Sequence, residues 1–400
     1  MERNWVFMLQ NYDLEQLAEP LLDWFAGHAR ILPWRENPTP YRVWVSEIML
    51  QQTRVEAVKP YFERFTGALP DVAALADCEE DILLKLWEGL GYYNRVRNMQ
   101  KAAIQVMETY GGALPADYEK LLELKGIGHY TAGAVASIAY GIPVPAVDGN
   151  VLRVITRASA DDTDIMKHSF RSAVKKALGD MMRELAIPAE LKGRLKDGNV
   201  PGAFNQALME LGATVCVPNG APLCGACPWE KMCLARVEGR IAELPVKSKA
   251  KARRVEKRTV LIIRDGQKVA IRKRRGSGLL AGLYELPNLE GEFSGEDVLG
   301  LVKKMQLSPI RIQKLEEARH IFSHIEWHMS GYAILVEEDG LAGSEYVRED
   351  VQEETHADLR DLIFVEAEDA SARYAIPSAF ATYAKYMNIK LGNERFEEDS

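Results

Sequence analysis

The sequence predicts a two-domain fold that is mainly α-helical over residues 1–236 and α+β over residues 258–390. Three observations support this fold class. Apolar residues recur at helical spacing through most of the first part. The composition changes at about Val237, where a cation-rich stretch with little apolar periodicity follows. Beyond that stretch come β-branched and alternating runs that are typical of strands. A chain of 400 residues is long enough to bury two or three separate cores.

The first part predicts a succession of helices. Residues 1–16 are expected to form a poorly ordered or frayed lead-in, followed by a helix over 17–29 that the prolines of ILPWRENPTPY end. The segment VWVSEIMLQQTRVEAVKPYFERF predicts one long helix over 43–65, which carries Glu47 on a face with Leu50, Gln51 and Arg54. Further helices are predicted at 71–77, 80–87, 95–110, 117–124, 130–140, 150–159, 168–183 and 202–213.

The second part begins after residues 237–257, which we interpret as a solvated linker, although their Lys/Arg run also suits a localisation signal. RTVLIIRDGQKVAIRKR predicts a hairpin around Asp265-Gly266. GLLAGLYELPNL, IEWHMSGYAILV and LIFVEAED predict more strands, and EDVLGLVKKM and IPSAFATYAKYM predict helices. Residues 391–400 form an acidic tail.

Composition narrows the class of protein. A hydrophobic content of 47% with 27% charged residues is that of a soluble globular chain. No apolar run approaches the roughly 18 residues of a membrane helix, and the N-terminus lacks the apolar core of a secretory signal. The net charge of −8 argues against a generally basic nucleic-acid binder, but binding depends on where the cations lie. We therefore expect a soluble globular protein without a membrane span.

The stretch LLELKGIGHYTAGAVASIAYGIPVPAVDGNVL predicts a helix, a glycine hairpin, a second helix and a loop that ends at Asp148. Gly126 and Gly128 permit the tight turn and close approach of such a hairpin. The N–H groups at the start of the second helix would face outward as a phosphate site. A phosphate site followed by a carboxylate suggests chemistry on a nucleic acid.

Four of the five cysteines fall within CVPNGAPLCGACPWEKMC, spaced C-x7-C-x2-C-x5-C, while Cys78 stands alone. Such clustering indicates a metal or cluster site in a reducing compartment rather than a disulfide framework. Four thiolates this close favour a [4Fe–4S] cluster, whereas structural zinc more often uses two separated C-x2-C pairs. Zinc and an unligated set remain as alternatives. The candidate ligands are Cys216, Cys224, Cys227 and Cys233.

Four features together resemble adenine glycosylases of the helix-hairpin-helix DNA glycosylase superfamily: PWR with SEIMLQQT, GLGYYNR, LKGIGHYTAG…VDGNV, and the cysteines. The resemblance covers nearly the whole chain. It implies a mainly α N-terminal helix-hairpin-helix glycosylase domain, like that of endonuclease III, with an Fe–S cluster loop, and an α+β Nudix-like C-terminal domain. It further implies a cytoplasmic, nucleoid-associated monomer of bacterial type that binds double-stranded DNA containing A:8-oxoguanine or A:G. One departure is that seven residues separate Cys216 from Cys224, where the family usually has six.

The resemblance also implies roles for Glu47 as catalytic acid and Asp148 as second carboxylate. Adenine is a poor leaving group until N7 is protonated, so an acid must stay protonated near neutral pH, and burial favours this. An ionised carboxylate can then stabilise or trap the oxocarbenium-like sugar, a division of labour known from glycoside hydrolases. Without the resemblance, Glu47 would be interpreted as a solvated surface residue and Asp148 as a helix cap.

Tyr130 bears on the reaction subtype. Related lyases of the endonuclease III type carry a Schiff-base lysine at the corresponding place, so Tyr130 favours base removal without strand cleavage. Packing in the core is the alternative role for Tyr130. The resemblance also matches Asn150 to a residue that orients Asp148 and the intermediate.

Base removal from a duplex requires the nucleotide to be flipped out. Gln52 and Tyr92 match the family's residues that insert into the base stack where the flipped nucleotide has left it. Other positions match residues that contact DNA in the family, and packing or surface charge is the alternative role for these. Those other DNA-contact positions are Arg30, Trp34, Arg35, Leu50, Thr53, Gly126 and Gly128.

The C-terminal part lacks the acidic run with which Nudix enzymes bind metal, since EDVLGLVKKM occupies that region. It is therefore expected to be a recognition module. Phe322, Ser323 and His324 match the family loop that senses 8-oxoguanine, and a serine can both donate to and accept from the oxidised base. The spacing of His320, His324 and His328 mimics a metal site, but the surrounding alternation is that of a strand.

The leading hypothesis is a monofunctional adenine glycosylase of base-excision repair. Two alternatives stay open, a thymine- or uracil-mismatch glycosylase of the same superfamily and a DNA-binding Fe–S protein without catalysis.

Overall fold

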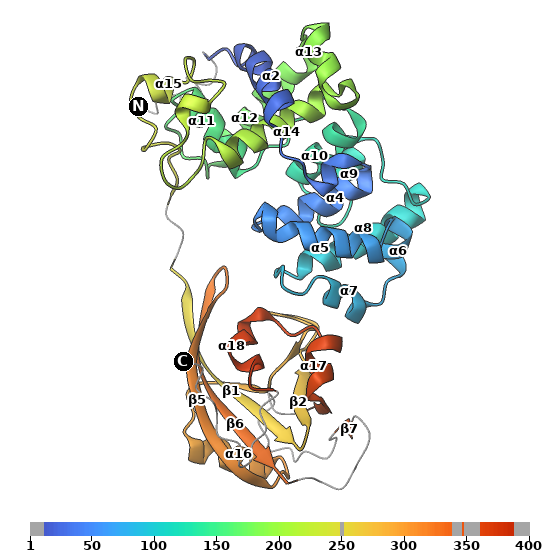
Figure 1. Ribbon diagram of the computed structural model, residues 1–400, viewed down its shortest axis with the longest axis vertical. Helices are drawn as coiled ribbons and strands as arrows, with labels where there is room; N and C mark the ends of the chain where they lie inside the picture. Colours follow the sequence, from blue (N-terminus) through green and yellow to red (C-terminus); the bar gives the residue numbers. More distant parts are fainter. Residues whose placement is uncertain (1–11, 249–251, 338–345, 348–360, 388–400) are drawn as a thin grey trace. The chain divides into compact units, whose positions relative to one another are not determined.

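The computed structural model describes residues 12–248, 252–337, 346–347 and 361–387 (Figure 1). The acidic tail and most of the predicted lead-in lie outside these residues. The chain divides into two compact units, one containing the residues up to Cys78 and Asn94–Lys249, the other Glu79–Tyr93 and the residues from Ala250 on. No helix among the described residues has the length and apolar character needed to cross a membrane.

The first unit is helical, as predicted. Short loops and short 3-10 turns connect its helices. The first helix begins at Ala18, close to its predicted start at residue 17. The helices are α2 (Ala18–His28), α3 (Pro33–Glu36), α4 (Pro40–Leu50), α5 (Val55–Ala68), α6 (Val72–Asp77), α8 (Asn94–Tyr110), α9 (Tyr118–Leu122), α10 (His129–Tyr140), α11 (Gly149–Ala158), α12 (His168–Glu184), α13 (Ala189–Arg194), α14 (Val200–Thr214) and α15 (Leu234–Val237).

The single long helix predicted over 43–65 is wrong, because α4 ends at Leu50 and α5 begins at Val55. Gln52 between them has a positive φ of 62°, which a continuing α-helix does not allow. The Arg95 guanidinium donates to the last carbonyls of α4, at 2.5 Å from Ile48 O and 2.8 Å from Gln51 O. Arg95 therefore caps the end of α4. Because the helix ends there, Gln51 and Arg54 do not lie on one helical face with Glu47.

Small residues make α10 a central helix of this unit. It contacts both α4 and α14. At Gly133 an added Cβ would lie 2.5 Å from the carbonyl oxygen of Pro145, and at Gly202 it would lie 2.8 Å from that of Ser137. Gly133 therefore lets α10 approach the loop before Asp148 closely, and Gly202 lets α14 approach α10. A separate apolar core joins α2, α11, α12 and α14.

The second unit contains α7 (Glu80–Leu86) and a mixed sheet in the order β5-β6-β1-β2-β8-β7, with β3 beside β2 and β4 beside β1. β1 and β6 pair in parallel, whereas the other pairs are antiparallel. The strands are β1 (Arg254–Asp265), β2 (Lys268–Lys273), β3 (Tyr284–Glu285), β4 (Asn288–Glu290), β5 (Pro309–Ile321), β6 (Ile325–Val336), β7 (Tyr346–Val347) and β8 (Leu362–Glu366).

Helices cover both faces of this sheet. α16 (Gly295–Lys304) packs on one face, where Val298 and Val302 join the core. The segment with η5 (Ser378–Phe380) and α18 (Ala381–Ala384) packs on the other, and α17 (Ala367–Arg373) follows β8 (Figure 1). The predicted hairpin at Asp265-Gly266 and the helix at EDVLGLVKKM are confirmed. The predicted helix at IPSAFATYAKYM is shorter than expected, and β5 was not predicted.

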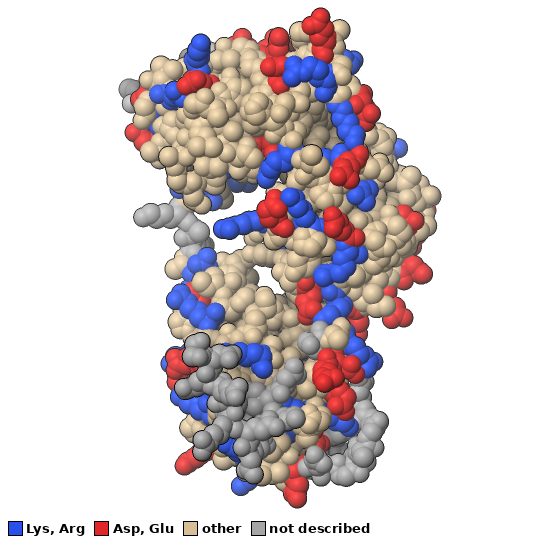
Figure 2. All heavy atoms as spheres, in the orientation of Figure 1, with Lys and Arg blue, Asp and Glu red and all other residues tan. Residues whose placement is uncertain are grey.

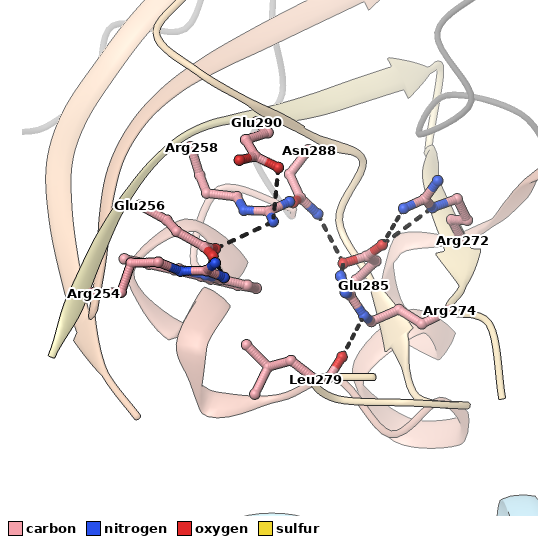
Figure 3. A network of polar contacts seen from close by, with 10 residues as sticks. Arg254, Glu256, Arg258, Arg272, Arg274, Leu279, Glu285, Asn288 and Glu290 are labelled. Carbon is pink, nitrogen blue, oxygen red and sulfur yellow. Dashed lines mark hydrogen bonds and ion pairs between the residues drawn. The ribbon is translucent and has the colours of Figure 1, made fainter. Parts of the chain in front are cut away.

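A buried charged network connects the strands of this unit (Figure 3). The Glu285 carboxylate is fully buried, and it accepts hydrogen bonds from Arg272 at 2.5 Å, from Arg274 and from Asn288 at 2.8 Å. Asn288 in turn accepts from Arg258 at 3.1 Å. Two guanidinium groups and an amide compensate the charge of Glu285, which is the condition for burying a carboxylate without a large penalty.

Candidate active site

The predicted glycine hairpin is present between α9 and α10. Gly126 has a φ of 79°, and a Cβ there would lie 2.7 Å from the Cβ of Asn98 on α8, so only glycine fits. Gly128 is the N-cap of α10 and has open space around its Cα. Because no side chain caps α10, the first N–H groups of this helix remain available to an anion.

Glu47 on α4 and Tyr130 on α10 meet where these helices pack. The Tyr130 hydroxyl donates to Glu47 Oε2 at 2.6 Å, and Glu47 is only 5% exposed. Burial raises the pKa of Glu47 to about 7, against an opposing effect of the Tyr130 hydrogen bond and with a further rise from Asp148. Burial also keeps the pKa of Tyr130 well above its usual value, so the phenol stays a donor. Glu47 is therefore a buried acid that exchanges its proton near neutral pH.

Asp148 has two structural partners. It is the N-cap of α11, where Oδ1 accepts from the Val151 N–H at 2.8 Å, and Oδ2 accepts from the Asn150 amide at 2.8 Å. Burial raises the pKa of Asp148 above its usual value, while these hydrogen bonds act in the opposite direction. The carboxylate thus caps a helix and also lies within electrostatic range of Glu47. Asp148 therefore caps α11, as the alternative role predicted, and its charge also acts on Glu47.

The orientation of Asn150 depends on a residue that the sequence did not single out. Arg153 on α11 donates to Asn150 Oδ1 at 3.0 Å, to the Gly212 carbonyl at 2.8 Å and to the Cys216 carbonyl at 2.9 Å. With its oxygen held by Arg153, Asn150 must direct its amide N–H toward Asp148. The hydrogen bonds form a chain from the candidate carboxylate to the cysteine segment.

Glu210 on α14 is a second buried carboxylate that sequence reasoning missed. It is 1% exposed, and it accepts from Arg30 Nε at 2.5 Å and from Arg35 Nη2 at 2.9 Å. Burial alone would raise the pKa of Glu210, but the two arginines hold it below its usual value. The predicted DNA-contact residues Arg30 and Arg35 are thus ordered by an ion pair, and the Arg35 charge also reaches Glu47.

The remaining predicted DNA-contact residues of this unit differ in exposure. Trp34 is buried and packs edge-on against Phe62, with ring centroids 5.4 Å apart. Leu50 is the half-buried last residue of α4. Gln52 is exposed at the break after α4, and Thr53 beside it is half-buried. The break therefore presents Gln52 to solvent, as a wedge residue requires, whereas Trp34 belongs to the core.

The four clustered cysteines are half-buried in the loop after α14. Burial raises the pKa of Cys227 to about 12, and Cys216, Cys233 and Cys224 contribute in that order. The four thiols thus lie within electrostatic range of one another. Arg157 Nη1 lies 3.3 Å from Cys216 Sγ. In the part of the chain that the structure describes, no three histidine, cysteine or carboxylate side chains converge as they would on a single metal ion.

The predicted reader residues form the turn between β5 and β6. Phe322 is half-buried, and its ring packs edge-on against Trp327 with centroids 4.9 Å apart. The Arg258 guanidinium lies over the Trp327 ring, 4.8 Å from its centroid. Figure 3 shows the network that holds Arg258. Ser323 and His324 are exposed. The Ser323 hydroxyl donates to that of Tyr92, a predicted wedge residue of the same unit, at 3.1 Å. Phe322 anchors the turn, and Ser323 and His324 are presented outward.

The histidines that mimic a metal site have separate environments. His320 packs edge-on against Phe322 at 4.6 Å, and burial lowers its pKa. His328 lies 2.6 Å from Glu326. His328 belongs to β6, the strand that the alternation predicted, and His320 belongs to β5.

A signal for two missed residues was present in the sequence. Arg153 and Arg157 follow the predicted Asn150 at spacings of three and four residues, so the three share a face of α11, and arginines on a buried face indicate a polar role. Asn205, which is fully buried, donates to the Val144 carbonyl and accepts from the Ala146 N–H, and it thereby holds the loop before Asp148. No sequence pattern indicates Asn205.

A helix-hairpin-helix fold with these two carboxylates defines a base-excision DNA glycosylase, and comparisons with known proteins agree. A model of the HhH-GPD superfamily of base excision DNA repair proteins matches residues 45–179, and a model of the NUDIX domain matches residues 259–386.

The chain belongs to the adenine DNA glycosylase family. It is 33% identical over 432 residues to the adenine DNA glycosylase of Rattus norvegicus, covering 94% of this chain and 79% of the relative. It is 31% identical over 314 residues to that of Buchnera aphidicola, covering 78% and 85%. The solved structure of a thermostable thymine-DNA glycosylase aligns with a TM-score of 0.46 and 26% identity, covering 56% of this chain and 96% of that one. The resemblance inferred from the motifs is confirmed.

The raised pKa of Glu47 predicts an unusual dependence of stability on pH. In the unfolded chain the pKa of Glu47 returns to 4.5, so between pH 4.5 and about 7 the folded state binds more protons. Stability is therefore lost as pH rises through this window, by about 3 kcal/mol in total at 1.36 kcal/mol for each pH unit. Urea unfolding of Glu47→Gln and the parent at pH 4.5 and pH 8 measures this. We expect the free energy of unfolding of Glu47→Gln, relative to that of the parent, to be higher at pH 8 than at pH 4.5.

The matched control is Glu63→Gln, an exposed glutamate on the neighbouring α5. Glu63→Gln should change the free energy of unfolding little at either pH. A Glu47→Gln difference that is the same at both pH values would show that folding does not shift the pKa of Glu47.

Proposed function

We propose that this glycosylase removes adenine paired with 8-oxoguanine or guanine by hydrolysing the N-glycosidic bond, without cutting the strand. The observation that carries the proposal is the pair formed by Glu47, with its pKa of about 7, and Asp148 within its electrostatic range. We assign base removal to residues 1–236 and reading of the opposite base to residues 258–390.

The geometry supports a division of labour between the carboxyl groups. Tyr130 occupies Glu47 Oε2, which leaves Oε1 to carry a proton to N7 of the departing adenine. Asp148 is held by Val151 and Asn150 and, when ionised, stabilises the positive charge that develops on the sugar. Water then completes hydrolysis. The flipped adenine requires polar partners as well, and Arg35, whose charge acts on Glu47, is one candidate.

We further propose that Cys216, Cys224, Cys227 and Cys233 hold a [4Fe–4S] cluster. Four thiols within electrostatic range of one another are the donor set that such a cluster takes. When bound, the cluster would cross-link the loop after α14, and it supplies no step of base removal. Arg153 and Arg157 connect this loop to α11.

A strand-scission assay tests the function. The protein is incubated with duplexes that contain A:8-oxoguanine, A:G, T:G or U:G, and half of each reaction is then treated with alkali. Cleavage at adenine alone, and only after alkali, is the expected result. Cleavage at T or U would favour the mismatch glycosylase, no cleavage would favour the non-catalytic DNA-binding protein, and cleavage without alkali would show lyase activity.

The reader turn makes a separate prediction. Replacing Ser323 and His324 together by alanine removes exposed hydrogen-bonding groups while Phe322 keeps the turn anchored. We expect the preference for 8-oxoguanine over guanine opposite adenine to fall by about 10-fold, which corresponds to roughly 1.4 kcal/mol and is typical of one or two hydrogen bonds. Single-turnover rates on the two duplexes measure the ratio. Ser277→Ala, an exposed serine of the same unit, is the control, and an unaltered ratio in the double variant would remove the turn from lesion reading.

A further inference from the structure

The segment Glu79–Tyr93 belongs to the second unit, although it lies within the first part of the chain. It runs between α6 and α8, and it falls inside the residues that match the glycosylase superfamily. It also carries Tyr92, the predicted wedge residue, whose hydroxyl accepts from the Ser323 hydroxyl of the reader turn. A segment of the glycosylase part therefore joins the unit to which we assign reading of the opposite base.

Two side chains of this segment bind the edge of a short stretch that follows α17. Lys85 Nζ donates to the Tyr374 carbonyl at 3.2 Å, and Glu88 Oε1 accepts from the Ile376 N–H at 2.8 Å. The Ala375 carbonyl between these groups accepts from β3 at 3.1 Å. Backbone groups that alternate in this way are those of a strand, with one side toward β3 and the other toward the segment. Lys85 and Glu88 therefore take the place of a neighbouring strand.

These contacts are more specific than a surface ion pair. The side chains of Lys85 and Glu88 pair with each other and are only 26% and 28% exposed. Cations and anions are interspersed over the face of the protein in Figure 2, so an exposed ion pair does not by itself define a docking position. The pair that Asp81 of α7 forms with Lys273 at 2.7 Å is of that exposed kind. Hydrogen bonds to two backbone groups, by contrast, fix the end of α7 at one place on the sheet.

The path from Glu88 to Tyr92 is short and ordered. Trp87 is fully buried, and its indole N–H donates to the Gly91 carbonyl at 3.1 Å. Tyr92 has a positive φ of 48°, which a residue other than glycine keeps only where its surroundings hold it. Tyr92 is 49% exposed even with its hydroxyl bound to Ser323. The position of Glu88 on the sheet therefore determines where the Tyr92 hydroxyl lies.

The contact between Ser323 and Tyr92 bears on which base is read. Because the Ser323 hydroxyl donates its proton to Tyr92, its oxygen is left to accept from the base. N7 of 8-oxoguanine carries a proton, whereas N7 of guanine is an acceptor, so an accepting hydroxyl favours the oxidised base. A hydroxyl released from Tyr92 could rotate and donate to guanine as well.

The inference rests on the proposed function, which assigns reading of the opposite base to this unit. We propose that Lys85 and Glu88 are positioning residues for this reading: they dock the segment on the Tyr374–Ile376 edge and thereby hold Tyr92 against the Ser323 hydroxyl.

Single-turnover excision from A:8-oxoguanine and A:G duplexes by full-length variants tests the proposal. Glu88→Ala loses the bond to the Ile376 N–H and should lower the preference for 8-oxoguanine by about 5-fold, which is typical of one hydrogen bond. Glu88→Gln keeps an oxygen that accepts there, so it should stay within about 2-fold of the parent. Glu296→Ala, which removes an exposed glutamate of α16, is the matched control and should leave the preference unchanged.

A double-mutant cycle separates this route from a general loss of stability. Added to Ser323→Ala, the Glu88→Ala substitution should lower the preference no further, because both changes act through the same hydroxyl. Losses that multiply would overturn the proposal, and so would a Glu88→Ala variant with the parental preference.

Hydrogen exchange measures the docking without a substrate. Glu88→Ala should speed exchange at the Ile376 amide and in the peptide that contains Tyr92, whereas Glu88→Gln should not. Unchanged exchange around Tyr92 in Glu88→Ala would overturn the inference, whatever the substrate preference of the parent. Faster exchange in this variant, with a parent that excises adenine equally from both duplexes or from neither, would contradict only the proposed function.

Discussion

Replacing Glu47 by glutamine is expected to slow adenine removal by about 10³-fold while duplex binding persists. The amide fills the same space next to Tyr130 but cannot give a proton to the departing base, and general acid catalysis contributes on the order of 10²–10⁴-fold. Single-turnover excision at saturating enzyme measures the loss, with binding followed by fluorescence anisotropy. Glu63→Gln serves as the control here as well, because Glu63 is an exposed glutamate of α5. A rate within 10-fold of the parent would exclude Glu47 as the acid.

The parent's pH profile follows from the same group. Glu47 donates only while protonated, so the single-turnover rate should decline as pH rises through about 7. Asp148 must be ionised to stabilise the sugar cation, so the rate should also decline at low pH, at a position above the usual pKa of aspartate. Glu47→Gln should lose the alkaline limb of this profile in its residual activity.

Replacing Asp148 by asparagine is expected to lower the excision rate by about 10²–10³-fold, with little effect on folding. Loss of the negative charge removes the stabilisation of the sugar cation, an effect of the size seen when one electrostatic partner of a transition state is deleted. Asparagine is as good an N-cap as aspartate, so the bond to the Val151 N–H can persist. Single-turnover excision and urea unfolding measure the two effects separately.

Asp148→Ala separates the charge from the cap. It should lose the same activity and about 1 kcal/mol of stability in addition, because α11 loses its capping group. If asparagine retains nearly the parental rate, the charge of Asp148 has no part in the chemistry, and its position would be explained by the helix alone.

The sequence was sufficient to predict most of the helices and the two carboxylates, because helical periodicity and the glycine hairpin are local patterns. It was not sufficient at places where tertiary contacts decide the conformation. The helix break at Gln52 depends on a positive φ at a residue other than glycine, and on capping by Arg95 from a distant helix. β5 was missed because it lies at the edge of the sheet, where exposed charged residues obscure the alternation of a strand.

The candidate site shows the same division. Glu47, Tyr130 and Asp148 were predicted from motifs, and the structure brings them together. Glu210 was not predicted, since a glutamate within an apolar helix shows nothing of the arginines that pair with it from another helix.

The double role of Asp148, as the cap of α11 and as the catalytic carboxylate that we propose, has a genetic consequence. An aspartate codon becomes an asparagine codon by a single G-to-A change, and the product would keep its fold and its grip on DNA while losing turnover. Such an allele would differ from a deletion. Its protein would bind lesions without repairing them, and it would thereby block repair by the protein from an intact copy of the gene. In a cell that also carries a normal copy, this one substitution should therefore raise the mutation rate more than loss of the whole gene.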